Sequence, residues 1–246
     1  MQHCDILIKP RWCVTGEGQL TVHGEHAVAV TDGKIAAILP NAEAERLFQP
    51  SRSVERPGHI LIPGLVNAHA HSAMTLFRGF ADDLPLETWL RERIWPAEKR
   101  WMGPEFVRDG TALAIAEMLR AGVTCFADQY FYPEIVANTA VDLNIRAVIA
   151  TPVLDFKTEW ANDAAEYLQK GADLVHDDYA DHPLITTAFA PHSTGVLSDE
   201  SFTALRVMAD QLDSPVQIHL HETQTEVSNE LKRTGLRPVA RLARLG

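Results

Sequence analysis

The chain carries at positions 60–71 the run Ile60-Leu61-Ile62-Pro63-Gly64-Leu65-Val66-Asn67-Ala68-His69-Ala70-His71. Its apolar residues are interrupted by a Pro-Gly pair and end in two histidines that are one residue apart. Because alternate residues of a β-strand point to the same face, His69 and His71 should project together from the end of a strand. Two imidazoles placed in this way can hold one metal ion, although an isolated pair of this kind could equally be structural.

A second histidine pair, His219-Leu220-His221, lies downstream and is followed directly by Glu222. Two strand-borne clusters of this kind are hard to explain by composition, and together they predict one metal site. His221 should point to the face opposite His219. We therefore expect His221 to be structural and not a metal ligand.

The bulk composition describes an ordinary globular protein. With 246 residues, 46% hydrophobic and 22% charged, the chain can bury one large core, with or without a small appendage. Its net charge of −11 and its lack of a Lys/Arg cluster argue against nucleic acid or an anionic membrane as a partner. No apolar run approaches the length of a membrane span.

The cysteines and the N-terminus bear on the compartment. The three cysteines are scattered and form no CxxC motif, which indicates reduced thiols. Residues 1–5 offer neither the basic nor the apolar part of an export signal. We therefore expect a cytoplasmic protein.

Positions 1–60 are predicted to form an N-terminal β-sandwich segment. Short strands are expected over 6–8, 26–30 and 34–38, and a short helix over 42–48. The last two strands should form a hairpin, because Asp32-Gly33 between them is a turn signal with positive φ available at the glycine. This segment alone has too little core to be stable, so it should pack on something else.

From position 65 onward strands alternate with helices. Strands are predicted over 65–71, 123–128, 147–154, 184–190 and 216–220. Helices are predicted over 104–121, 134–143, 163–175, 199–212 with Ser198 as N-cap, 222–234 and 238–245. This alternation implies a parallel sheet, and the number of units favours a (β/α) barrel over a doubly wound sheet. We accordingly expect 61–246 to form the first part of a barrel domain.

Polar residues gather at the carboxyl ends of the predicted strands. They are His69, His71, Asp128, Gln129, Asp155, His192 and His219 to Glu222. Barrel active sites are built from the ends of several strands, so this pattern predicts a site at that end. Asp128 and Asp155 remain open, since either could cap a helix instead.

These motifs resemble the metal-dependent amidohydrolase superfamily. The resemblance is carried by 63–71 (PGLVNAHAH), 122–124 (GVT), 190–193 (APHS) and 219–223 (HLHET), and it covers essentially the whole chain. Within the superfamily the chain is most similar to the 5-methylthioadenosine/S-adenosylhomocysteine deaminase branch, close to triazine hydrolases and guanine deaminases. The resemblance implies an α/β, TIM-like (β/α)8 barrel with a small N-terminal β-sandwich segment, of which this chain would supply about five βα units.

The resemblance also implies roles for individual residues. His69, His71 and His219 would be ligands of one Zn²⁺ per subunit, with Fe²⁺ as an alternative metal. Glu222 would be the general acid that protonates the purine. Glu98 would bind the ribose hydroxyls, His192 would contact the substrate, and Trp89 would form an aromatic wall.

Without the resemblance, three of these residues could be interpreted as structural rather than functional. Glu98, beside Lys99 and Arg100, is most simply a solvated helix carboxylate. Trp89 alone is most simply a core side chain, and His192 could be a loop residue.

Two departures from the family pattern stand out. Family members have eight βα units, and the units absent here supply a further histidine and aspartate of the site. We therefore expect a truncated part of a longer protein, with little activity by itself.

The second departure concerns the substrate. Family members that accept S-adenosylhomocysteine bind its carboxylate with arginines. This chain has no arginine between Arg146 and Arg206, and it has Thr151 where the first would lie. This favours the uncharged methylthio substrate.

The function implied is zinc-dependent hydrolytic deamination of 5'-methylthioadenosine, with S-adenosylhomocysteine or adenosine as further substrates, to the inosine analogue and ammonia. The partner would be a small purine nucleoside, and we expect a homo-oligomer. One alternative is a hydrolase of triazines, guanine or another aminoheterocycle. The other is an inactive fragment that serves as a binding partner.

Overall fold

The computed structural model describes residues 1–16 and 19–246, and the chain divides into two compact units, Met1–Gly64 and Leu65–Gly246. The longest helix has 17 residues. Among the described residues, no helix combines the length and the apolar character that crossing a membrane requires.

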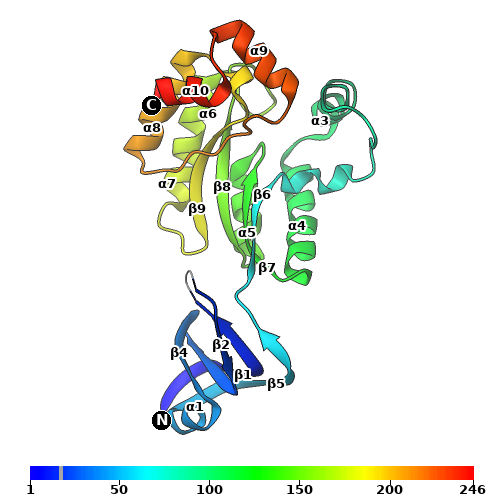
Figure 1. The fold of residues 1–246 in the computed structure, drawn as a ribbon. Coiled ribbons are helices and arrows are strands. Elements are labelled where there is room, and N and C mark those ends of the chain that lie inside the picture. Colours follow the sequence, from blue (N-terminus) through cyan, green and yellow to red (C-terminus); the bar gives the residue numbers. More distant parts are fainter. Residues whose placement is uncertain (17–18) are drawn as a thin grey trace. The chain divides into compact units, whose positions relative to one another are not determined.

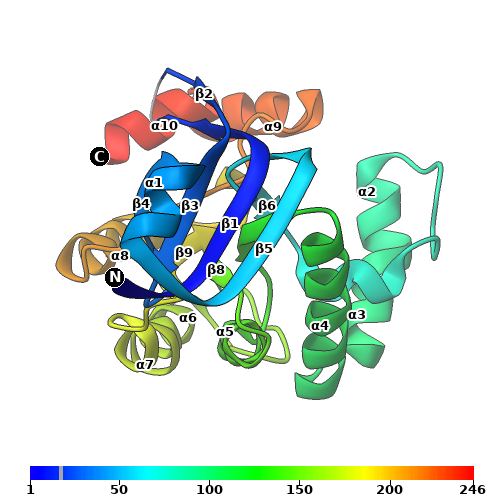
Figure 2. The same cartoon turned by 90° about the horizontal axis from the view of Figure 1, so that it is seen from below.

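The first unit is a mixed sheet with one helix against it (Figures 1 and 2). Its elements are β1 (Gln2–Thr15), β2 (Thr21–Gly24), β3 (His26–Thr31), β4 (Lys34–Pro40), α1 (Asn41–Leu47) and β5 (Phe48–Leu61). The strand order is β2-β1-β3-β4, and β5 pairs in parallel with β1. A small core of Cys4, Leu7, Ala27, Ala29, Ala44 and Phe48 joins the sheet to α1.

The predicted hairpin of the first unit is confirmed. β3 and β4 pair antiparallel up to Thr31 and Lys34, and Asp32 and Gly33 between them have φ of 51° and 71°. The strand β5 was not predicted, because it contains Pro50, Pro57 and several charged residues. Such residues are tolerated at a sheet edge, and within this sheet β5 pairs with β1. That this unit belongs to a β-sandwich stays a prediction.

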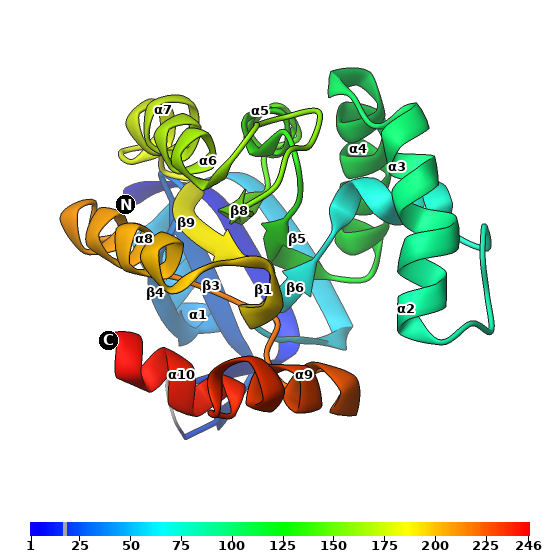
Figure 3. The same cartoon turned by 90° about the horizontal axis from the view of Figure 1, so that it is seen from above.

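The second unit is built on a parallel sheet of order β6-β7-β8-β9. These strands are β6 (Leu65–Ala70), β7 (Val123–Gln129), β8 (Arg146–Val153) and β9 (Ile185–Pro191). The connecting helices include α4 (Pro104–Arg120), α5 (Pro133–Asp142), α6 (Ala164–Gly171), α7 (Asp177–Tyr179) and α8 (Asp199–Gln211). Figure 3 shows them following one another along one side of the strands. The alternation predicted from residue 65 onward is confirmed for these four strands.

The prediction of a fifth strand over 216–220 is wrong. The segment makes two isolated parallel bridges, Phe189 with Val216 and Ser193 with His219. Both bridges run to β9 or to the loop that follows it. Because no strand of the described chain pairs with the other edge of the segment, a regular ladder does not form. The second bridge nevertheless fixes His219 beside the end of β9.

Between β6 and α4 the chain forms short, irregular helices that the sequence pattern did not predict. They are a 3-10 helix at Ser72–Phe77, α2 (Leu86–Thr88), a π-helix at Trp89–Ile94 and α3 (Trp95–Trp101). A second π-helix, Ala172–His176, continues α6. The last two helices, α9 (Gln224–Thr234) and α10 (Pro238–Leu245), agree closely with their predicted ranges.

Both undecided aspartates accept a backbone hydrogen bond at the start of a helix, but neither is the N-cap residue of that helix. The carboxylate of Asp128 accepts a hydrogen bond from the backbone N–H of Ser72 at 2.6 Å, at the turn that follows His71. Asp155 accepts from the N–H of Ser198 at 2.6 Å and from the hydroxyl of Ser201. Ser198 itself accepts from the N–H of Ser201 at 3.1 Å, which confirms it as the N-cap of α8.

Gly110 is where α4 approaches the 3-10 helix that follows His71. A Cβ at this position would lie 2.4 Å from the carbonyl oxygen and 2.8 Å from the Cα of Ala73, and both are backbone atoms. We expect Gly110→Ala to lower the free energy of unfolding by about 1–3 kcal/mol, although alanine is the better helix former.

Denaturant unfolding followed by circular dichroism measures this loss. Gly58→Ala is the control, because a Cβ there meets nothing within 4 Å. Its effect should stay within about 0.5 kcal/mol. A Gly110→Ala protein as stable as the parent would contradict the close approach.

Candidate active site

Three histidine side chains converge at the carboxyl end of the sheet. His69 is on β6, His71 directly follows it, and His219 is held by its bridge to Ser193. The Nε2 atoms of His69 and His71 are 3.2 Å apart, and those of His69 and His219 are 3.0 Å apart. One ligand atom from each of the three lies within 4.8 Å of the others. The structure thus brings together the three residues predicted as metal ligands.

Backbone carbonyl groups fix the orientation of two of these rings. The Nδ1 of His71 is 2.6 Å from the carbonyl oxygen of Gln129, and that of His219 is 2.9 Å from the carbonyl oxygen of His192. A carbonyl can only accept, so each Nδ1 carries a hydrogen, and Nε2 is the nitrogen left to bind a metal. Metal-binding histidines typically have this arrangement.

The protonation state also suits a metal ligand. Burial lowers the pKa of His71 to about 4, so its ring is neutral at pH 7. Burial likewise lowers the pKa of His69, as does the nearby His219. Three imidazoles whose Nε2 atoms converge fit a divalent ion that prefers nitrogen ligands.

A cavity of about 620 Å³ adjoins these histidines. Its lining includes His71 and His219 and every residue predicted to act on the substrate: Trp89, Glu98, His192 and Glu222. Much of the remaining lining is apolar and includes Met74, Leu86, Leu90, Ile94, Met102 and Phe131. A largely apolar cavity with a few polar groups on its walls is typical of a small-molecule site.

Glu98 is not a solvated helix carboxylate. It lies on α3 with 8% of its surface exposed, and its Oε1 accepts a hydrogen bond from the Tyr130 hydroxyl at 2.7 Å. Burial raises the pKa of Glu98, and the bond from Tyr130 opposes that rise. Burying a carboxylate costs free energy, so buried carboxylates with a raised pKa are found mostly at functional sites. Glu98, which faces a cavity, fits this pattern.

The two other residues with a structural reading also reach the cavity. Trp89 begins the π-helix and is half-buried. His192 packs its ring against His219, with ring centroids 4.7 Å apart. Burial and the neighbouring histidines lower the pKa of His192 to about 4, so it too is neutral.

The N-terminus of α9 holds Glu222 at the cavity. Glu226 accepts a hydrogen bond from the backbone N–H of Glu222 at 2.7 Å, and the hydroxyl of Thr223 accepts from the N–H of Glu226 at 3.0 Å. The cap by Thr223 fixes the start of the helix, and Glu226 fixes the backbone of Glu222 just before it. His221 is exposed, has a φ of 58° and lies outside the group of three histidines.

The sequence analysis missed several residues of the cavity, among them Tyr130 and two lysines. Tyr130 follows the flagged pair Asp128-Gln129, so its position at a strand end was a usable signal. Lys99 and Lys157 also line the cavity, and Lys157 lies in the loop after β8. Only an arginine was expected there as the partner of a substrate carboxylate, although a lysine also carries the positive charge.

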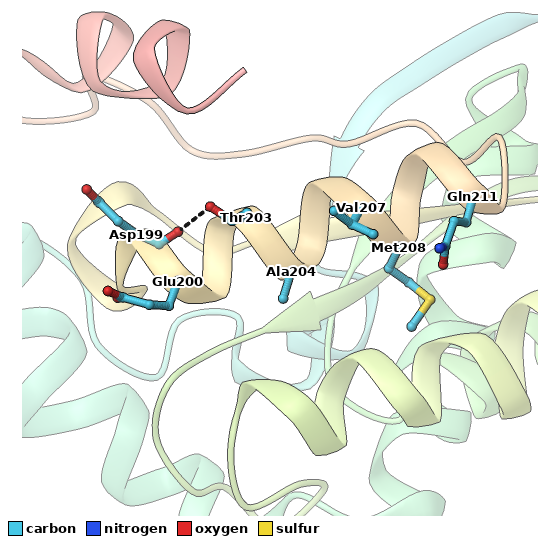
Figure 4. A pocket seen from close by; sticks show the side chains of 7 residues that line it. All are labelled: Asp199, Glu200, Thr203, Ala204, Val207, Met208 and Gln211. Carbon is cyan, nitrogen blue, oxygen red and sulfur yellow. Dashed lines mark hydrogen bonds between the residues drawn. The ribbon is translucent and has the colours of Figure 1, made fainter.

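A second cavity of about 610 Å³ runs along the outer face of α8 and shares no lining residue with the first (Figure 4). Its seven lining residues include no histidine or cysteine, and Thr203 donates its hydroxyl to the backbone carbonyl of Asp199 at 2.8 Å. The three converging histidines and the buried Glu98 line or adjoin the first cavity, which is therefore the candidate active site.

Comparison with known proteins identifies the family to which the chain belongs. The sequence model of the Amidohydrolase family matches residues 60–243. The chain is 43% identical over 242 residues to a 5-methylthioadenosine/S-adenosylhomocysteine deaminase of Saccharophagus degradans, covering 98% of this chain and 54% of the relative. The chain thus spans about half the length of the curated relatives it matches.

Solved structures give the same answer for the fold. An adenosine deaminase from Xanthomonas campestris with bound zinc has a TM-score of 0.97 and 49% identity, covering 100% of this chain and 56% of that one. Atrazine chlorohydrolase from Arthrobacter aurescens with zinc has a TM-score of 0.87 at 21% identity, covering 98% of this chain and 58% of that one. The expected fold class is confirmed, and the chain belongs to the amidohydrolase family.

Proposed function

We propose that this chain provides the metal-binding and purine-binding part of a zinc-dependent deaminase that acts on 5'-methylthioadenosine. The observation that carries the proposal is the convergence of three imidazole Nε2 atoms beside a cavity lined by Glu222 and the buried Glu98. The names of the relatives support this reading, since several at 35–46% identity are called 5-methylthioadenosine/S-adenosylhomocysteine deaminases.

The metal would be held by the Nε2 atoms of His69, His71 and His219. Zinc fits these three nitrogen ligands, and Fe²⁺ is the second candidate. When bound, zinc lowers the pKa of a coordinated water toward 7 and so supplies a hydrolytic nucleophile. The carbonyl groups of Gln129 and His192 would keep the rings of His71 and His219 in the ligating orientation.

The chain's own residues would then direct the substrate. Glu222 lines the cavity together with His219, and as a general acid it would protonate N1 of the purine. Protonation of N1 makes C6 more electrophilic. An oxygen from water replaces the C6 amino group, which leaves as ammonia. Trp89 and His192 would contact the purine, and Glu98 would accept hydrogen bonds from the ribose hydroxyls.

The residues around the cavity favour an uncharged 5' substituent. The apolar lining suits a methylthio group, and the loop after β8 carries no arginine. We expect a higher kcat/KM for 5'-methylthioadenosine than for S-adenosylhomocysteine when zinc-loaded protein expressed from the whole gene is assayed with both by ultraviolet absorbance. Equal values would contradict the preference, and Lys157→Ala would then show whether that lysine holds the carboxylate. No turnover of either would overturn the proposed function.

Glu98→Gln tests the ribose contact. A carboxylate accepts stronger hydrogen bonds than an amide, so we expect KM for the nucleoside to rise about 10- to 100-fold while kcat changes little. Heterocycles that lack ribose should bind the variant as well as they bind the parent. An unchanged KM for the nucleoside would contradict the ribose contact and would favour a triazine or guanine hydrolase.

Location and assembly also belong to the proposal. A cytoplasmic location is supported by the three free cysteines, of which Cys4 and Cys13 are buried. Self-association into a homo-oligomer is proposed as well, and light scattering of the purified protein tests it.

A further inference from the structure

Tyr130 forms a hydrogen bond with Glu98, but the proposed function gives Tyr130 no role. Tyr130 directly follows β7, with 5% of its surface exposed, and its hydroxyl donates to Oε1 of Glu98 at 2.7 Å. Both residues line the histidine cavity. The two side chains come from segments 32 residues apart in sequence, so the bond ties α3 to the end of the sheet.

The direction of this hydrogen bond is fixed. Burial raises the pKa of Tyr130, and the neighbouring Glu98 raises it further. The phenol therefore remains protonated and can donate. Oε1 of Glu98 is occupied as its acceptor, while Oε2 makes no hydrogen bond within the described residues 1–16 and 19–246. One oxygen is thus held and the other is left to accept from a ligand.

The surroundings of Tyr130 make it a rigid anchor. Its ring belongs to the core beneath the cavity and lies edge-on to Phe131, with ring centroids 5.6 Å apart. The preceding residue, Gln129, supplies the carbonyl that orients His71. Two consecutive residues at the end of β7 thus hold one histidine of the metal group and one carboxylate of the cavity wall.

We propose that Tyr130 is a positioning residue that holds the Glu98 carboxylate by one oxygen and leaves the other free to accept from the vicinal hydroxyls of a ribonucleoside. The inference rests on the proposed function, because it assumes that the cavity binds a ribonucleoside. Without the phenol, the Glu98 carboxylate would lose its one fixed contact and could rotate away from the diol.

The test is a double-mutant cycle with Tyr130→Phe, Glu98→Gln and the double variant. Phenylalanine keeps the packing of the ring and removes only the hydroxyl. We expect Tyr130→Phe to raise KM for 5'-methylthioadenosine about tenfold with kcat within about a factor of two, since a hydrogen bond to a charged group is lost. In the Glu98→Gln background the same change should have no further effect on KM.

Two controls separate positioning from a structural role. Inhibition by a 2',3'-dideoxy nucleoside, which lacks the diol, should be the same for Tyr130→Phe and the parent. Tyr179→Phe is the matched control variant. The hydroxyl of Tyr179 donates to Asn138 at 2.6 Å, and neither residue lines the cavity, so the KM of this variant should equal that of the parent. Thermal unfolding of each variant checks that the fold is kept.

The outcomes distinguish the inference from the function on which it rests. An active parent enzyme with an unchanged KM in Tyr130→Phe overturns the inference and leaves the proposed function standing. The inference is also overturned if Tyr130→Phe raises KM equally in the parent and Glu98→Gln backgrounds, or if it weakens inhibition by the dideoxy nucleoside to the same extent. Either result would indicate a structural role for the hydroxyl. A parent protein that is expressed from the whole gene, loaded with zinc and still turns over no nucleoside overturns both.

Discussion

Replacing His71 with alanine is expected to abolish metal binding and to lower kcat/KM for 5'-methylthioadenosine on the order of 10³-fold. The variant removes one of three converging Nε2 atoms and leaves a gap in a buried part of the site. Two imidazoles cannot hold zinc as tightly as three, and the hydrolytic nucleophile depends on the metal. Metal content by mass spectrometry and the deamination rate should fall together.

His221→Ala is the control for this prediction. It removes a histidine from the same short segment as His219, but one that is exposed and outside the converging group. Its metal content should equal that of the parent. Full metal content in His71→Ala, or loss of metal in His221→Ala, would show that the ligands are assigned wrongly.

Replacing Arg241 with alanine is expected to lower the free energy of unfolding by about 3–5 kcal/mol. Arg241 is fully buried and forms ion pairs with Asp199 at 2.6 Å and with Glu230 at 3.2 Å. It also donates to the backbone carbonyl groups of Thr194 at 2.6 Å and Leu197 at 3.0 Å. One side chain thus joins α8, α9, α10 and the loop that follows His192.

The cost is large because of what the substitution leaves behind. Glu230 is 2% exposed and would keep only Arg233 as an ionic partner among the described residues. The two carbonyl groups would lose a charged donor, although Arg233 still donates to that of Thr194 at 2.9 Å. Buried polar groups without partners are among the most destabilising defects a protein can have.

Urea unfolding of Arg241→Ala and Arg244→Ala measures the difference. Arg244 pairs with the same Asp199 at 3.0 Å, but its side chain is 51% exposed, so its removal should cost less than about 1 kcal/mol. Similar losses in the two variants would contradict the account of Arg241 as the buried connection between the helices.

The local sequence pattern was enough to predict those site residues that lie at the ends of strands. The alternation of His69 and His71, and the repeated strand-helix units, are short-range features that depend on backbone geometry alone. They led to the histidine group and to the carboxyl end of the sheet. The roles of Glu98, Trp89 and His192 needed the family resemblance, because nothing in their neighbours distinguishes them from surface or core residues.

Features that depend on distant partners were not predictable. Arg241 lies in an amphipathic helix and would be taken for a surface residue, but its acceptors come from segments 11 to 47 residues away. The bond between Tyr130 and Glu98 spans 32 residues. The segment 216–220 has a strand-like sequence but only β9 and its following loop as described neighbours, so propensity alone gave the wrong element.

The central claim is that the three histidines hold one metal ion that makes this cavity a hydrolytic site. The most direct measurement uses protein that is expressed from the whole gene and stripped of metal with a chelator. Zinc is then added stepwise, and deamination of 5'-methylthioadenosine is measured at each step. The account predicts no activity without metal and a linear rise that stops at one zinc per chain. Activity in the metal-free protein, or no activity at any ratio of zinc to protein, would contradict it.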